Sequence, residues 1–172
     1  MKCLKRTSIS IVAIAIASLG AALLLAQGGG RGEATATIGS AHVSIDYGCP
    51  TLKGRDPLSM LKPGQVWRLG ANASTTIESD HDLLFGNTRV PKGKHILLAQ
   101  LAEPGKWVLV ASTKPFDEYD SSAKIAETPM TVENGQQSVE QMTIKLSANG
   151  NQGNVEVAWG TSRLAATFSV AE

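Results

Sequence analysis

The residues best suited to chemistry lie between positions 66 and 77, in the sequence VWRLGANASTTI. Side chains of an extended strand alternate between its two faces, so Trp67 and Leu69 would point into a core. The opposite face would carry a guanidinium, a carboxamide and hydroxyls, from Arg68, Asn72, Ser74 and Thr76. Such groups can hydrogen-bond a carboxylate, a phosphate or a sugar.

Two interpretations of this stretch stay open. In the first, Asp46 or Asp56 pairs with Arg68 and fixes the long loop of residues 48–64 against the sheet. In the second, the same region forms a pocket for a small polar or anionic ligand. The candidate ligand-binding residues are Asp46, Arg55, Arg68, Asn72 and Thr76.

Other chemistries have weaker signals. The histidines lack the spacing of a metal site; they are His42, His81 and His95. Residues 79–82 read as an exposed polar turn. There is no Gly-x-Ser-x-Gly motif, and Ser74, His42 and Asp46 would converge only by accident of the tertiary structure. We therefore expect no metal, no cofactor and no catalytic residues, and leave open whether the protein is an enzyme.

The amino end predicts export. Residues 1–6 are basic and residues 9–26 are almost wholly apolar. This pattern is typical of a signal peptide over residues 1–26, with an uncleaved membrane anchor as the alternative. The glycine-rich residues 27–32 would form a leader, and residues 33–172 one domain. The expected location is periplasmic or secreted, with membrane contact only through the N-terminal segment.

Charge and cysteine content restrict the partners. The chain has 16 basic and 15 acidic residues, and three of the bases lie in the predicted signal. Without a basic run, nucleic acid is not an expected partner. Beyond the signal, Cys49 is the single cysteine, so no internal disulfide is available, and we expect a buried, inert thiol. Oligomeric state is not fixed by any of these features.

Period-two alternation dominates the rest of the chain and predicts about ten short strands. The fold class we expect is all-β, an antiparallel β-sandwich of jelly-roll or immunoglobulin-like kind. The clearest expected hairpins join residues 34–38 to 43–47, 83–85 to 88–90, 95–101 to 106–112, and 155–159 to 164–170.

The chain resembles a bacterial exported family, domain-of-unknown-function family 2911. The matching pieces are Ile45–Gly48, Leu52–Arg55, Val66–Arg68, Gly70–Asn72, Thr75–Thr76, Val90–Pro91, Gly93, Trp107, Val139–Gln141, Trp159–Gly160 and Arg163. The resemblance implies export and an all-β domain but no activity. Cys49 stands where the family pattern has arginine, and Lys94 and His95 also depart from it.

Three functions remain as hypotheses. The first is a non-catalytic exported module that binds a small polar or anionic ligand, or has a structural role in the envelope. The second is a hydrolase-like enzyme that uses the polar face around Arg68. The third is an envelope protein whose edge strand pairs with a partner.

Overall fold

A computed structural model describes residues 30–171, so the predicted signal of residues 1–26 and the first part of the glycine-rich leader lie outside the described residues. The described residues are all-β, with ten antiparallel strands and two short 3-10 helices. The predicted all-β antiparallel class is confirmed. Within residues 30–171, no helix is long and apolar enough to cross a membrane. The strands are β1 (Arg31–Ile38), β2 (Ala41–Gly48), β3 (Val66–Trp67), β4 (Thr76–Ser79), β5 (Leu83–Phe85), β6 (Thr88–Val90), β7 (Gly93–Glu103), β8 (Lys106–Ser112), β9 (Lys124–Asn149) and β10 (Gln152–Val170), and the helices are η1 (Phe116–Glu118) and η2 (Ser121–Ala123).

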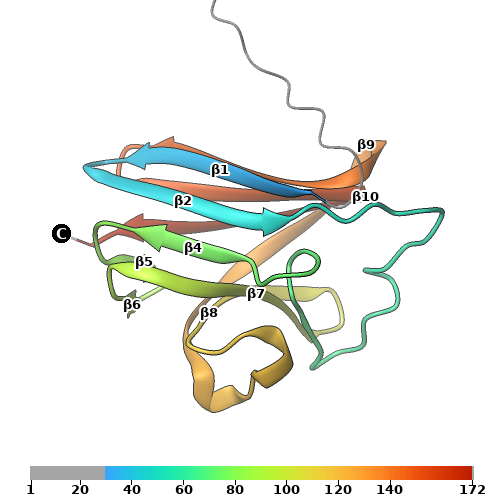
Figure 1. Cartoon of the computed structure of the whole chain (residues 1–172), viewed down its shortest axis with the longest axis horizontal. Helices are drawn as coiled ribbons and strands as arrows, with labels where there is room; N and C mark the ends of the chain where they lie inside the picture. Colours follow the sequence, from blue (N-terminus) through green and yellow to red (C-terminus); the bar gives the residue numbers. More distant parts are fainter. Residues whose placement is uncertain (1–29, 172) are drawn as a thin grey trace, which may run out of the picture.

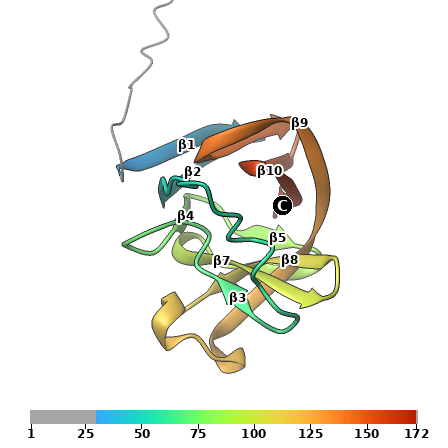
Figure 2. The same ribbon diagram turned by 90° about the vertical axis from the view of Figure 1, so that its right-hand side faces the viewer.

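The ten strands form one continuous sheet that folds over on itself without closing. The strand order is β1-β2-β4-β7-β8-β9-β10-β5-β6, and β3 pairs with β7. The orange and red strands β9 and β10 run through both layers (Figure 1, Figure 2). They contain 26 and 19 residues, so these two strands are much longer than expected. The predicted hairpin of residues 155–159 and 164–170 is wrong, because both segments lie in the single strand β10 and pair with β9.

A break in the β9–β10 ladder allows this long hairpin to bend. The pairing register shifts between Ala158 and Ser162, where Gly160 has a positive φ of 58°. Arg163 fills the break: its Nη1 donates to the carbonyl oxygens of Gly160 and Ser162 at 3.0 and 2.9 Å. Its Nη2 donates to that of Gln137 at 2.7 Å. The guanidinium thus satisfies backbone acceptors that the interrupted ladder leaves unpaired.

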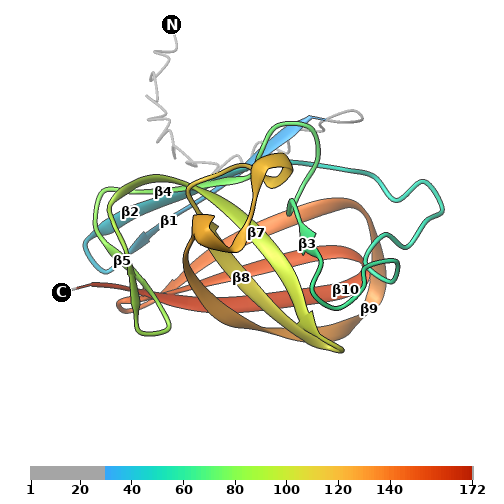
Figure 3. The ribbon, with the colours of Figure 1, turned by 90° about the horizontal axis from the view of Figure 1, so that it is seen from below.

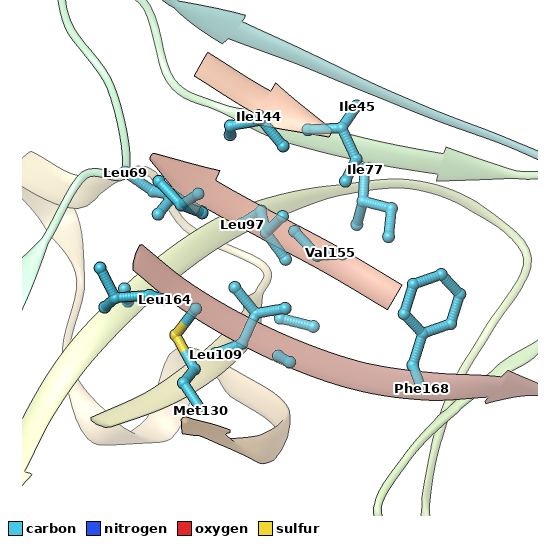
Figure 4. Close-up of a cluster of buried hydrophobic side chains, with 14 of the residues drawn as sticks. Ile45, Leu69, Ile77, Leu97, Leu109, Met130, Ile144, Val155, Leu164 and Phe168 are labelled. Atoms are coloured by element: carbon cyan, nitrogen blue, oxygen red, sulfur yellow. The ribbon is translucent and has the colours of Figure 1, made fainter. Parts of the chain in front are cut away.

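The core lies between the two layers. Figure 4 shows aliphatic side chains from β2, β4 and β7 meeting those of β9 and β10, with Phe168 at one end. Near the other end of the core, Trp67 stacks on Trp159, with ring centroids 5.8 Å apart, and meets Trp107 edge-on at 6.4 Å. Aromatic pairs of this geometry stabilise beyond their buried area.

Cys49 is buried, as predicted, and is a free thiol. Burial raises the pKa of this thiol, which opposes formation of the reactive thiolate. The neighbouring Tyr47 crosses over Gly32 on β1, where a Cβ would lie 2.7 Å from the ring. Its hydroxyl donates to the carbonyl oxygen of Ile144 at 3.4 Å, which links β2 to β9.

Candidate functional site

The stretch between residues 66 and 77 is mostly a tight loop, and the prediction of a continuous extended strand is wrong. Only Val66–Trp67 is extended before β4, and both Leu69 and Asn72 have positive φ, 54° and 61°. Trp67, Leu69 and Ile77 are nevertheless buried, as the alternating pattern predicted. Large apolar side chains are usually buried whether they belong to a strand or to a loop. The burial of these residues could therefore be predicted, although the path of the backbone could not.

Two glycines permit this loop. A Cβ at Gly48 would overlap the carbonyl oxygen of Ala71, and one at Gly70 would lie 2.8 Å from Oγ1 of Thr75. That hydroxyl is fully buried and donates to the carbonyl oxygen of Leu69 at 2.7 Å. The loop therefore packs backbone to backbone against the end of β2.

Arg68 lies beside the loop and contacts a distant segment. Its Nη1 donates to the carbonyl oxygen of Asn72 at 3.0 Å, and its Nη2 to Oδ1 of Asp117 in η1 at 3.1 Å. The guanidinium also stacks over the ring of Phe116, 4.7 Å from its centroid. Figure 3 shows the gold η1–η2 segment next to the green loop that precedes β4.

The predicted pairing of Arg68 with Asp46 or Asp56 is therefore wrong. Asp56 accepts from the backbone N–H of Ser59 at 3.3 Å within its own turn. Asp46 pairs instead with Arg31, whose Nε donates to its Oδ1 at 2.8 Å. The turns at positive φ direct Arg68 toward η1, which a strand would not have done.

Arg31 holds the other side of the same loop. Its Nη1 and Nη2 donate to the carbonyl oxygens of Ala73 and Ser74 at 3.2 and 3.1 Å. Arg31 and Arg68 thus bind the carbonyls of three successive residues, 72–74, and a carboxylate holds each guanidinium. We call this pair the arginine clamp. Loop carbonyls outside any ladder need donors, and the clamp supplies them.

A hollow lies elsewhere, over the outer face of β1, β2 and β4. Its volume is about 660 Å³. The strands meet here in register, with Thr37 opposite His42 and Ser44 opposite Glu78, so their outward side chains form one polar face. We call this hollow the outer groove, and it is lined by Thr35, Ala36, Thr37, His42, Val43, Ser44, Glu78, Ser79 and Asp80.

A second hollow of about 380 Å³ adjoins the outer groove and shares Ser44 and Glu78 with it. Asp46 and Thr76, opposite one another in the β2–β4 ladder, both line this second hollow. They are the two predicted site residues that come together on this face.

The other predicted site residues lie apart from them. Arg68 and Asn72 belong to the clamp, where Asn72 contributes its carbonyl oxygen. Arg55 lies in the exposed loop after β2, and its Nε donates to the carbonyl oxygen of Leu52 at 3.5 Å. The five predicted residues therefore do not surround one pocket.

A hydrogen-bonded chain of polar residues occupies the hairpin end of the outer groove. His42 donates its backbone N–H to Oδ1 of Asp80 at 2.8 Å, and its Nδ1 lies 3.1 Å from Oδ2. Nδ1 of His81 lies 2.8 Å from Oδ1 of Asp80, and Nε2 of His81 lies 3.4 Å from Oγ of Ser40. The hydrogen bond from His81, followed by that from the His42 backbone, holds the pKa of Asp80 well below its ordinary value.

Sequence reasoning missed this chain of residues. Within the predicted polar turn of residues 79–82, Ser79 ends β4 and only Asp80 and His81 form a bend. The β2–β4 register places this bend beside the β1–β2 turn. The adjacent residues Asp80 and His81 were the available signal, because a carboxylate next to a histidine can hold its ring. Their partners Ser40 and His42 lie about forty positions away, which no local pattern reveals. Within residues 30–171, no group of three or more His, Cys, Asp or Glu side chains is arranged to hold a metal.

Together these features define an all-β antiparallel domain with a clamped loop beside a polar-faced sheet. The chain belongs to the family described as protein of unknown function (DUF2911), whose match covers residues 30–168. The resemblance to domain-of-unknown-function family 2911 is thereby confirmed. No curated protein and no solved structure matches the chain.

Proposed function

We propose that this protein is an exported module that binds a small polar ligand in the outer groove. The observation that carries the proposal is the hollow of about 660 Å³ on a sheet face whose outward side chains are polar. Strands satisfy their own backbone groups, so these side chains are available to a ligand. A cleft of this size falls within the range of small-molecule sites.

The charge of the groove favours a hydroxylated or amine-bearing ligand. Glu78 and Asp80 supply its carboxylates, and threonine and serine supply hydroxyls. The cations of the adjoining hollow have acidic partners: Arg31 Nε lies 2.8 Å from Asp46 and Lys94 Nζ lies 3.9 Å from Glu78. Carboxylates and hydroxyls accept hydrogen bonds from hydroxyl and ammonium groups, whereas an anion would meet like charge.

Binding is tested by a thermal-shift screen of sugars, polyols and amines, followed by calorimetry of any hit. Glu78→Gln should weaken a hit by removing charge, and Ser44→Leu should weaken it by filling the groove. Glu133→Gln, on an exposed position of β9, is the matched control and should leave affinity unchanged. A hit that both groove variants bind as tightly as the wild type would contradict the proposal, as would a screen without hits.

Export is proposed from the sequence of residues 1–26. Lys2, Lys5 and Arg6 precede the apolar run, and Gln27 would begin the mature chain. Mass spectrometry of the exported protein should show a start at or near Gln27. An intact Met1 would contradict cleavage and support the membrane-anchor alternative.

The two alternative functions, a hydrolase centred on Arg68 and an envelope protein that pairs through an edge strand, have less support. Both Nη atoms of Arg68 are bound within the clamp, which counts against a hydrolase centred on that residue. For edge pairing, β6 has three residues, and the outer side of β1 faces β9. The Gly39 N–H donates to the carbonyl oxygen of Gly150 at 2.9 Å and joins the ends of those two strands.

A further inference from the structure

The hairpin end of the outer groove has the arrangement of an activated nucleophile. Ser40 Oγ lies 3.4 Å from Nε2 of His81, and Nδ1 of His81 lies 2.8 Å from Oδ1 of Asp80. With the proton on Nδ1 and directed at Asp80, the lone pair of Nε2 faces the serine hydroxyl. A hydroxyl, a base and an orienting carboxylate in this order form the relay of nucleophilic hydrolases, which is recognised by geometry rather than by sequence order.

The carboxylate of this relay is fixed by β2. The backbone N–H of His42 donates to Oδ1 of Asp80 at 2.8 Å, and the His42 ring lies 3.1 Å from Oδ2. The backbone N–H of His81 donates to Oγ of Ser79 at 3.2 Å. A base whose carboxylate and backbone are both held can keep one orientation and one tautomer.

The hydroxyl is carried by a tight turn. Ser40 follows Gly39 in the two-residue connection of β1 and β2, and Gly39 is anchored by its bond to Gly150. Within residues 30–171, no hydrogen bond occupies the backbone N–H of Ser40, so it can donate to an oxyanion formed at its own side chain. His42, two residues on, already lines the outer groove.

We propose that Ser40 is a catalytic nucleophile, with His81 as its base and Asp80 as the positioning residue, for hydrolysis of a carboxylic ester held in the outer groove. This inference rests on the proposed function in one respect: the outer groove is the site that binds the polar part of the ester. The substrate class is a small ester with a hydroxylated or amine-bearing part, as the lining of the groove favours.

The steps balance without a further reactant other than water. Ser40 Oγ bonds to the ester carbonyl carbon while its proton passes to Nε2 of His81. The carbon–oxygen bond to the alcohol breaks, and the alcohol leaves with that proton. Water then gives a proton to His81 and attacks the acyl-serine, and Ser40 recovers its proton as the acid departs. The products are one carboxylic acid and one alcohol.

The test uses the exported chain with a serine-reactive fluorophosphonate, peptide mapping by mass spectrometry, and p-nitrophenyl acetate turnover. We expect an adduct on Ser40 that forms at least ten-fold more slowly in His81→Gln and is absent in Ser40→Ala. Turnover should fall at least ten-fold in both variants, since a general base contributes about 10²–10⁴ in rate. Circular dichroism verifies that each variant is folded.

Two controls separate this relay from ordinary surface reactivity. Ser138→Ala removes an exposed hydroxyl of β9 that belongs neither to the relay nor to the outer groove, and His95→Gln removes a half-buried imidazole whose Nε2 lies 2.7 Å from the Pro91 carbonyl oxygen. Both should keep wild-type labelling and turnover. The proposal would be overturned if Ser40 were not labelled, or if it were labelled at the same rate in His81→Gln as in the wild type. It would also be overturned if Ser40→Ala kept wild-type turnover.

The proposal of ligand binding in the outer groove is contradicted by a different result from the one that contradicts the Ser40 proposal. Ser40→Ala should still bind a ligand found in the calorimetric screen, because its hydroxyl is not part of the groove lining. Conversely, Glu78→Gln should lose that ligand and retain the Ser40 adduct, because the small fluorophosphonate does not depend on Glu78. If no ligand binds but the Ser40 adduct still forms, the binding proposal is contradicted and the proposed role of Ser40, His81 and Asp80 is retained.

Discussion

The arginine clamp and the outer groove both gather charged and polar side chains at the β1–β2 side of the molecule, but they use them differently. In the clamp, Arg31 and Arg68 bind the backbone carbonyls of residues 72–74. In the outer groove, polar side chains surround a hollow of about 660 Å³. The same residue types thus bind loop carbonyls in one place and line an open hollow in the other.

The backbone explains the difference. Residues 68–75 lie outside any strand, so their carbonyl groups need donors from elsewhere in the chain. The groove is built on β1, β2 and β4, which pair with one another and satisfy their own backbone. Clamp substitutions should therefore change stability, and groove substitutions should change binding or reactivity. The following predictions test that division.

The largest effect is expected at Gly48, where the loop packs onto β2. In Gly48→Ala the new Cβ would overlap the Ala71 carbonyl oxygen, and backbone must move because no flexible side chain can give way. We expect the free energy of unfolding to fall by about 3 kcal/mol, measured by urea denaturation. Gly54→Ala is the control, since nothing lies within 4 Å of its Cβ position. Its φ of 73° should cost only about 1 kcal/mol.

The next effect concerns the clamp itself. Arg68→Met keeps the apolar stem but removes the bonds to Asn72 and Asp117 and the stacking on Phe116. Because the Arg68 side chain is 31% exposed, solvent screens the ion pair, and we expect a loss of about 1–2 kcal/mol. Arg55→Met, in the exposed loop, should be nearly neutral in the same denaturation experiment. Equal losses in the two variants would refute a special role for the clamp.

A smaller effect is expected at Cys49, which follows Gly48 and lies outside both sets of residues. Its thiol is buried and unpaired, and burial raises its pKa, so it should react slowly with a thiol reagent in the native state and quickly after unfolding. Cys49→Ala should cost about 1 kcal/mol, for a small buried side chain. Ligand binding and Ser40 labelling should remain at wild-type level. Rapid native-state modification would contradict this placement.

The smallest effect is expected at Asp80, in the groove. Its depressed native pKa means that the folded state binds the proton less readily than the unfolded chain, so it stabilises the fold above about pH 4. That contribution is lost as the pH falls through the native pKa. Urea midpoints should therefore fall less steeply below pH 4 in Asp80→Asn than in the wild type. The exposed-residue variant Glu133→Gln should keep the wild-type slope, and an identical slope in Asp80→Asn would refute the role of the His42 and His81 contacts.

Much of the fold could be predicted because its signals are local. Alternation and turn residues predicted the β1–β2, β5–β6 and β7–β8 hairpins, each confirmed by its pairing. The length of β9 could not be predicted, because it runs through Pro129, and a proline has no N–H to give to a strand ladder. Its pairing across the bend depends on Arg163, which reaches the carbonyl oxygen of Gln137, 26 positions away in the sequence.

For the candidate site, the sequence by itself determined that Asp46 and Thr76 would be outward polar residues and that Trp67 and Leu69 would be buried, because strand period and hydrophobicity act over a few residues. Only the tertiary structure decided the partners. Arg68 meets Asp117, and Ser40 meets His81, through packing of segments about forty to fifty positions apart. Positive φ at Leu69 and Asn72 sets the first contact, and strand register sets the second. Both depend on the whole chain being folded, so no local pattern could show them.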